Sequence, residues 1–247
     1  MPVRDVTSQD RSLTRDLRRA VPLLHGDGDE CWGLAWPALA WLESELRSGM
    51  ATLETGAGTS TLVFAAAGTE HESVTPESAE EDRVRAECAR RNISSARVNF
   101  RIGPSHEVLP KLPYRPLDLV LIDGAHGFPY PLLDWWYLAP RLRVGGQMVL
   151  DDCYMPPVAV LLDFLREQAS WKIEELLGRR TVVVRKLSDE APAYVWRGES
   201  IGGKLTFRHL PAVRRARAAI EHRILESRLG LRMAAVARKT GVARRLG

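Results

Sequence analysis

Three carboxylates and one imidazole follow apolar segments in the middle of the chain. Asp123 ends one such segment and His126 comes three residues later, while Asp151 and Asp152 end another. If both segments are parallel strands, their carboxyl ends meet at one edge of a sheet, where open α/β sheets bind ligands. Three acids gathered there would repel one another without a cation, and Mg²⁺ prefers oxygen ligands of this kind. The pattern predicts a Mg²⁺ site formed by Asp123, Asp151 and Asp152.

His126 is placed to act as a base beside that site. A metal ion would hold and acidify a substrate hydroxyl, and an imidazole, which titrates near neutrality, would take its proton. Simpler roles stay open for each residue. Asp123 would then orient a cofactor or cap a loop, one of Asp151 and Asp152 would be structural, and His126 would only bond a loop.

A glycine-rich turn follows the first predicted strand and indicates a second ligand-binding element. Such a turn lets a ligand approach the backbone closely. A dinucleotide-binding turn needs a third glycine, and Thr61 stands at that position; the Glu54 carboxylate would also repel a pyrophosphate. Glu54 instead suits a ligand that carries an ammonium and a sulfonium, such as S-adenosylmethionine. A plain tight turn with a surface glutamate is the alternative. The residues of the turn are Leu53-Glu54-Thr55-Gly56-Ala57-Gly58-Thr59-Ser60-Thr61.

Apolar runs alternate with helical patterns through the central part of the chain. Strict alternation of strands and helices predicts parallel strands joined by right-handed crossovers, hence a doubly wound α/β sheet. A β-hairpin around Gly178 adds a sixth and a seventh strand. The predicted strands are 51–54, 71–75, 97–102, 117–123, 146–151, 172–177 and 181–186, and the helices between them are 59–67, 77–92, 105–111, 128–141 and 157–168.

The residue patterns divide the chain into three parts. Residues 1–48 are predicted to form a helical cap, because apolar residues recur at helical spacing over 12–24 and 36–46. Residues 49–187 form the predicted α/β core. Residues 188–247 are predicted to form a basic helical extension.

The composition is that of a globular protein in a reducing compartment. Of the 247 residues, 45% are hydrophobic and 27% are charged, which argues against disordered and fibrous classes. No window approaches the roughly 18 apolar residues that a bilayer span needs, and the first residues lack a signal-peptide core. Cys31, Cys88 and Cys153 are odd in number and lack metal-ligand spacing. We therefore expect a cytoplasmic protein with reduced thiols.

The net charge of +4 is unevenly distributed. Residues 204–247 hold twelve Lys or Arg and two Glu, a net of +10, which leaves −6 on residues 1–203. We expect a solvated face of terminal helices; an anionic membrane surface, a nucleic acid or an acidic patch on a second subunit are the alternatives. An apolar stripe in this extension predicts an amphipathic helix that packs on the core or forms a homo-oligomer. The stripe consists of Val213, Ala216, Ile220, Ile224 and Leu229.

The glycine-rich turn resembles motif I of class I S-adenosylmethionine-dependent methyltransferases, whose fold is Rossmann-like. The matching residues are Glu54, Gly56 and Gly58. In that family these positions line the methionine half of the cofactor, which implies that Thr59 and Ser60 lie beside it. The family has an acidic residue at the end of its second strand for the ribose hydroxyls. Here Thr75 stands at that position, and Glu77, two residues on, is the alternative.

Two further motifs resemble O-methyltransferases. Gly103–Pro110 is similar to a G-x-S-x-E-x-L-P stretch that borders the adenine, so Ser105 is implied in that contact, with a helix N-cap as its other role. The Ile-Asp-Gly-x-His run at 122–126, with the later Asp-Asp pair, resembles metal-dependent enzymes that methylate sugar hydroxyls of natural products. That resemblance implies Mg²⁺ on the three aspartates and His126 as the base. It spans residues 50–186 and leaves the terminal helices uncovered.

We therefore expect an enzyme that transfers a methyl group from S-adenosylmethionine to a hydroxyl of a small molecule, with Mg²⁺ assistance. A nucleic-acid methyltransferase that uses the basic extension is one alternative. It is disfavoured because only Phe207 is interleaved with the basic residues for base stacking. A non-catalytic binding or assembly protein is another. A nicotinamide oxidoreductase is disfavoured by Glu54 and Thr61.

Overall fold

The computed structural model of the chain describes residues 12–25 and 33–190, together with four positions between 212 and 220. The chain divides into two compact units, 1–193 and 194–247, and all seven strands lie in the first. Ala216 and Ile220 of the predicted apolar stripe are helical and exposed; the rest of the stripe lies outside the described residues. In the part of the chain that is described, no helix is long and apolar enough to cross a bilayer.

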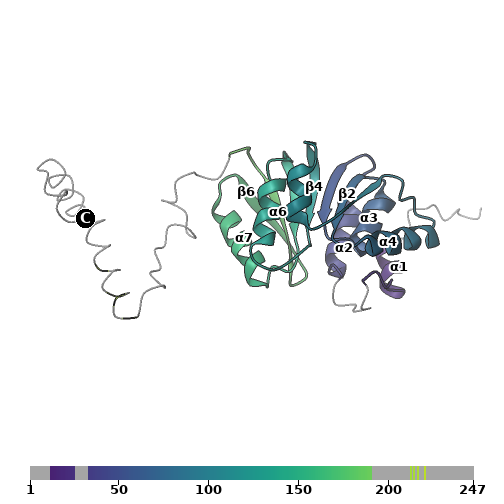
Figure 1. Cartoon of the computed structure of the whole chain (residues 1–247), viewed down its shortest axis with the longest axis horizontal. Coiled ribbons are helices and arrows are strands. Elements are labelled where there is room, and N and C mark those ends of the chain that lie inside the picture. The colour runs from purple at the N-terminus through teal and green to yellow at the C-terminus, as the bar shows by residue number, and fades with distance from the viewer. Residues whose placement is uncertain are drawn as a thin grey trace, which may run out of the picture. The chain divides into compact units, whose positions relative to one another are not determined.

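One seven-stranded sheet forms the centre of the first unit (Figure 1). The strand order is β3-β2-β1-β4-β5-β7-β6; β1 to β5 are parallel, and β7 is antiparallel to both β5 and β6. This confirms the predicted doubly wound, mostly parallel sheet. The strands are β1 (Ala51–Thr55), β2 (Glu70–Thr75), β3 (Val98–Ile102), β4 (Leu117–Ile122), β5 (Leu142–Leu150), β6 (Trp171–Leu177) and β7 (Thr181–Lys186).

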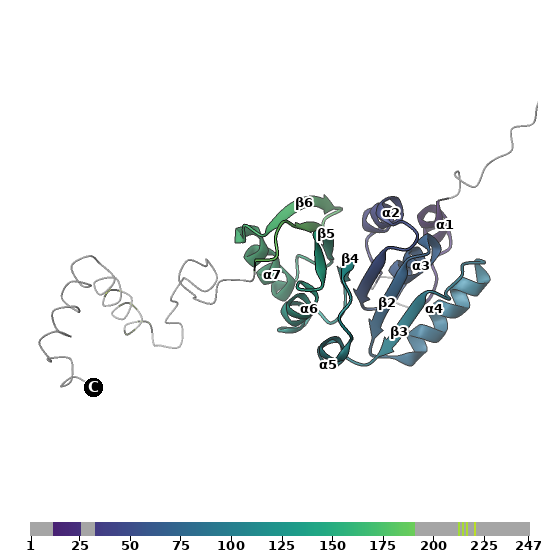
Figure 2. The ribbon, with the colours of Figure 1, turned by 90° about the horizontal axis from the view of Figure 1, so that it is seen from above.

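Helices cover both faces of the sheet (Figure 2). The helices that precede β3 in the chain, including the two N-terminal helices, contribute to one apolar cluster. The helices that follow β3 contribute to a second apolar cluster. The first group consists of α1 (Leu13–Arg19), α2 (Trp36–Glu45), α3 (Thr59–Ala67) and α4 (Ser78–Arg90). The second consists of α5 (Ser105–Val108), the 3₁₀ turn η3 (Leu109–Lys111), α6 (Tyr130–Leu138) and α7 (Pro156–Glu167).

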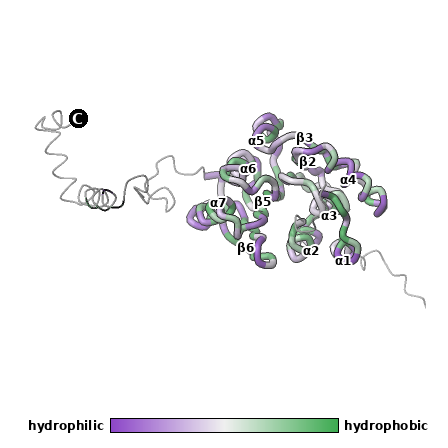
Figure 3. The backbone as a smooth tube through the Cα atoms, turned by 60° about the horizontal axis from the view of Figure 1, so that its bottom comes forward, coloured by the Kyte–Doolittle hydropathy of each residue, from purple (hydrophilic) through white to green (hydrophobic). Residues whose placement is uncertain are grey.

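The two clusters follow from the alternation of side chains along each strand. In β4, Leu119 and Leu121 belong to the first cluster, and Val120 and Ile122 belong to the second. Figure 3 shows the consequence for the helices: α3 is largely hydrophobic, whereas α4 carries hydrophilic residues along much of its length. α3 is therefore buried between the sheet and the N-terminal helices.

Two predicted boundaries were wrong for identifiable reasons. The helix predicted over 12–24 ends at Arg19, because Pro22 disfavours helical geometry at the residue before it; Leu24 is nevertheless buried. The fifth strand begins at Leu142, four residues before the predicted start. Gly145, with φ +85°, lies inside it, where a register shift against β4 accommodates an irregularity.

The strand order reverses direction between β1 and β4. From β1 the chain proceeds to β2 and β3 on one side, and from β4 it proceeds to β5 on the other. Ligands of open α/β sheets bind outside the carboxyl ends of the strands at such a reversal. The topology therefore places the candidate site after Thr55 and Ile122, where the sequence motifs lie.

Candidate functional site

Glu54 is a buried carboxylate that holds the start of α3 against β2. Its side chain accepts hydrogen bonds from Ser60 Oγ at 2.6 Å, from Ser73 Oγ at 3.0 Å and from the Thr61 hydroxyl. His71 Nε2 lies 3.2 Å from Oε1. These donors compensate for burying the group, which is 1% exposed. The predicted contact of Glu54 with a ligand ammonium stays a prediction; the structure shows that both oxygens already have protein donors.

Gly56 lies where no other residue fits without strain. Its φ of +94° is in the left-handed region. A Cβ at this position would also lie well inside contact distance of the Asp123 carbonyl oxygen. The Gly56 N–H donates to the Val74 carbonyl at 2.8 Å. The glycine-rich turn is therefore held against the ends of β2 and β4.

The N-terminal segment also reaches this turn. Gly58 has an extended backbone, and a Cβ on it would lie 3.3 Å from His25 Nε2. His25 Nδ1 in turn lies 3.1 Å from a carboxylate oxygen of Glu80. His25 could not be singled out from the sequence, because its partners come from distant parts of the chain.

The carboxylate beside the end of β2 belongs to Glu80. The buried Thr75 hydroxyl donates to Glu80, whereas Glu77 is exposed at the N-cap of α4. Burial acts to raise the pKa of Glu80, but the hydrogen bonds from His25 and Thr75 outweigh it, so the pKa lies below the ordinary value. Glu80, in the first turn of α4, therefore lies beside Thr75 at the end of β2. The predicted ribose contact stays a prediction.

Ser105 faces a second buried acid. It is the first residue of α5, and Pro104 is the N-cap, so the N-cap role considered for Ser105 was wrong. Burial raises the pKa of Asp134 on α6, and the hydroxyls of Ser105 and Thr55 offset part of that rise. The Asp134 side chain is fully buried.

His126 lies between two of the predicted acids. Its Nδ1 is 3.1 Å from Asp152 Oδ2, and its Nε2 is 3.6 Å from Asp123 Oδ1. Asp152 has φ +53°, a left-handed conformation that is uncommon for non-glycine residues but that Asp adopts more readily than most. An imidazole oriented through one nitrogen by a carboxylate, with its other nitrogen available, is the arrangement of a general base.

The Asp151 side chain contacts Arg180 and Thr181 rather than His126. It is fully buried, one oxygen accepts from the Thr181 hydroxyl, and the other lies 2.9 Å from Nη2 of Arg180. Nη1 of Arg180 lies 3.3 Å from Asp152 Oδ1. Both contacts are ion pairs rather than aligned hydrogen bonds. Arg180 reaches this edge because β7, which begins at the next residue, is antiparallel to β5 and starts beside its end.

The three predicted metal ligands do not form one set. Ligand atoms of Asp123, His126 and Asp152 lie within 4.8 Å of one another, and Asp151 is not among them. Burial and the charges of Asp151 and Asp152 raise the pKa of Asp123 well above its usual range. Both oxygens of Asp152 already face a nitrogen, one of His126 and one of Arg180. The residues therefore do not fit a Mg²⁺ ion held by three free carboxylates.

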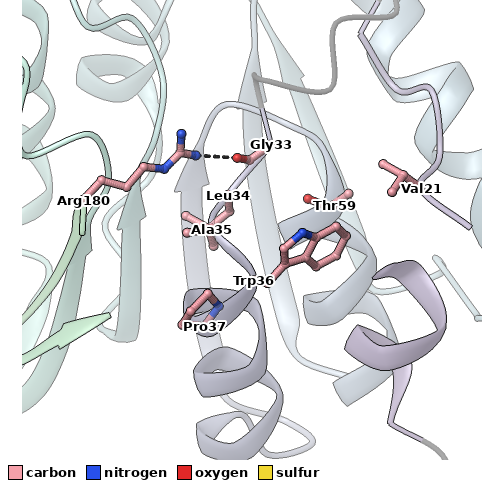
Figure 4. A pocket seen from close by; sticks show the side chains of 8 residues that line it. All are labelled: Val21, Gly33, Leu34, Ala35, Trp36, Pro37, Thr59 and Arg180. Atoms are coloured by element: carbon pink, nitrogen blue, oxygen red, sulfur yellow. Dashed lines mark hydrogen bonds between the residues drawn. The ribbon is translucent and has the colours of Figure 1, made fainter. Parts of the chain in front are cut away.

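A cavity of about 390 Å³ opens beside the glycine-rich turn. Thr59, at the start of α3, and Arg180 are its polar residues (Figure 4). Figure 4 shows Arg180 reaching to the Gly33 carbonyl, to which it donates a hydrogen bond. The lining is otherwise mainly apolar: Val21, Gly33, Leu34, Ala35, Trp36 and Pro37.

Comparison with protein families gives a match that covers both the turn and the acidic edge. Residues 53–153 match a family described as a methyltransferase domain. Comparison with curated protein sequences found no match.

Solved structures give the same fold. One similar structure is the O-methyltransferase TomG from Streptomyces achromogenes, in complex with SAM (18% identity, 72% of this chain and 91% of that chain, TM-score 0.57). Another is an O-methyltransferase from Bacillus cereus in complex with SAH (15% identity, 74% and 94%, TM-score 0.58). At these identities the likeness concerns the fold.

Proposed function

We propose that this chain is an S-adenosylmethionine-dependent methyltransferase and that it methylates a hydroxyl oxygen of a small molecule. The match of residues 53–153 to a methyltransferase domain and the fold shared with an O-methyltransferase in complex with SAM support this proposal. The observation that carries the proposal is the pair of Asp152 and His126 at the carboxyl edge of the sheet, beside the cofactor-binding turn. A hydroxyl acceptor must lose a proton during transfer, and this pair can take it.

The chemistry follows from the two nitrogens of His126. With Nδ1 directed at Asp152, Nε2 is left to accept the proton of the acceptor hydroxyl. The hydroxyl oxygen attacks the methyl carbon in line, the carbon–sulfur bond breaks, and S-adenosylhomocysteine leaves. Asp123 lies on the Nε2 side, at the end of β4, against the turn that contains Gly56. Most of the acceleration comes from holding the two reactants in line.

The residues that we assign to the cofactor lie at the same carboxyl edge of the sheet. We assign the methionine half to the turn of Gly56, Gly58, Thr59 and Ser60, with Asp123 beside it. Ser105 is assigned to the adenine end. For the ribose we favour Thr75 together with the Glu80 carboxylate over Glu77, since Glu80 contacts Thr75 and Glu77 is exposed.

No step is assigned to Mg²⁺, although the sequence favoured its assistance. A divalent ion on Asp123, His126 and Asp152 would engage the imidazole that the reaction needs as a base. The nucleic-acid alternative depends on residues 204–247, which lie almost entirely outside the described residues.

The test is methyl transfer from labelled S-adenosylmethionine to a panel of phenols, catechols and sugars. His126→Ala should lower turnover by about 10²–10⁴-fold while S-adenosylmethionine still binds, and Asp152→Asn should cause a smaller loss. His106→Ala is the control, because His106 lies on α5 and its ring contacts Tyr130, not Asp123 or Asp152. Unchanged turnover in His126→Ala, or an equal loss of turnover and cofactor binding, would contradict the role of His126.

A further inference from the structure

The acidic edge already contains a cation of its own. Arg180 lies beside Asp151 and Asp152, with nitrogen–oxygen distances of 2.9 and 3.3 Å. We propose that Arg180 is the resident cation of this edge, that it positions Asp152 for His126, and that methyl transfer proceeds without a divalent metal. The proposal rests on the proposed function for its catalytic part and on the ion pairs for the rest.

The position of Arg180 is fixed by its backbone and its neighbours. The Arg180 carbonyl accepts a hydrogen bond from the Cys153 N–H at 2.8 Å, which joins the hairpin turn to the residue after Asp152. Thr181, the next residue, donates to Asp151. The guanidinium also donates to the Gly33 carbonyl. The first two contacts hold the hairpin turn beside the acids, and the third restrains the guanidinium at the end of the Arg180 side chain.

A guanidinium suits this place because it is planar, always charged and has five N–H groups, so it can face two carboxylates at once. Of the four oxygens of Asp151 and Asp152, two face Arg180, one accepts from Thr181 and one faces His126. Mg²⁺ requires nearly octahedral oxygen ligands at about 2.0–2.1 Å. To bind Asp151 and Asp152, Mg²⁺ would have to displace the Arg180 guanidinium, so the metal ion and the guanidinium exclude each other.

Arg180 then acts as a positioning residue for the base. It contacts one oxygen of Asp152, and His126 contacts the other. Without the guanidinium, Asp151 and Asp152 would repel each other, and Asp152 would lose one of the two contacts that hold it. The carboxylates would then be free of their resident cation, and a divalent ion could bind them.

Mn²⁺ binding to the full chain, followed by electron paramagnetic resonance, tests this without an acceptor. Wild type should show no Mn²⁺ site tighter than about 1 mM. Arg180→Ala should gain one site at least about tenfold tighter, and adding Asp152→Asn should remove it. Arg179→Ala is the matched control, since Arg179 is exposed in the same turn and should behave as wild type.

Activity provides the second readout. Wild-type turnover should be unchanged by a chelator, Arg180→Ala should lose turnover, and Arg180→Lys should recover part of it. A wild-type Mn²⁺ site in the micromolar range that Asp123→Asn or Asp152→Asn removes would overturn the proposal. So would a folded Arg180→Ala protein that gains no Mn²⁺ affinity. If Arg180→Ala does not fold, Arg180→Gln takes its place. Failure to bind S-adenosylmethionine would instead count against the proposed function, and is measured separately.

Discussion

Replacing Gly56 by alanine should show how closely the glycine-rich turn approaches the sheet. An alanine at φ +94° pays about 1–2 kcal/mol for the left-handed backbone. Its Cβ would also overlap the Asp123 carbonyl oxygen, and relieving such an overlap in a packed region costs about 1–3 kcal/mol more. The expected loss in the free energy of unfolding is therefore about 2–5 kcal/mol.

Gly145→Ala is the matched control. Gly145 has a similar φ of +85°, but a Cβ there would meet no atom within 4 Å, so only the backbone cost of about 1–2 kcal/mol applies. Urea unfolding of the two variants separates the backbone cost from the overlap. Calorimetric titration with S-adenosylmethionine should show at least about tenfold weaker binding for Gly56→Ala and unchanged binding for Gly145→Ala. Equal losses of stability together with equal cofactor affinities would refute the reasoning.

Three further predictions concern buried or half-buried titratable groups. Glu54→Gln should lower the free energy of unfolding by about 2–4 kcal/mol in urea, because an amide nitrogen would replace an oxygen that accepts hydroxyl donors; an unchanged midpoint would contradict the role given to the carboxylate. Glu80 has a lowered pKa, so its contribution to stability is complete above the ordinary value of 4.5 and is lost as the pH falls through the folded value. Glu80→Gln should therefore flatten that part of the acid limb in thermal unfolding between pH 7 and 3, and parallel curves would contradict this. Burial raises the pKa of Cys153 to about 12 and that of Cys88 to about 11. Neither thiol should therefore react with iodoacetamide at pH 8 in the folded state. Rapid labelling of either thiol, detected by mass spectrometry, would count against that burial.

The sheet was predictable because its signals are local. Apolar runs and helical periodicity alternate along the chain, and parallel strands joined by right-handed crossovers admit few arrangements. The end of α1 was missed because periodicity continues to Leu24, while Pro22 interrupts the helix before it. The start of β5 was missed because Gly145 and Gly146 are typical of a turn, although the strand passes through them with an irregular register.

The candidate site was predictable where its residues directly follow strands. Asp123 and Asp152 lie at one edge because parallel neighbours end together, and His126 is close to Asp123 in sequence. Arg180 was missed because its position depends on β7 running antiparallel to β5, which brings a hairpin turn back to the acids. Glu80 was missed because it reaches back from the first turn of α4 to Thr75.

Mg²⁺ was the cation predicted at the acidic edge, because hard metal ions offset the repulsion of clustered carboxylates. The cation that the structure brings to Asp151 and Asp152 is the Arg180 guanidinium. No spacing rule in the sequence links Arg180 to residues some thirty positions earlier. Long-range ion pairs of this sort become visible only once strand order and direction are known.

Calorimetric titration of the full chain with S-adenosylmethionine and with S-adenosylhomocysteine is the most direct test of the central claim. The arrangement of Gly56, Gly58 and Asp123 at the ends of β1 and β4 predicts that both ligands bind at the same single site. Gly56→Ala should weaken both. If the folded wild-type protein binds neither ligand, the assignment of this edge to the methyl donor is contradicted, whatever the acceptor.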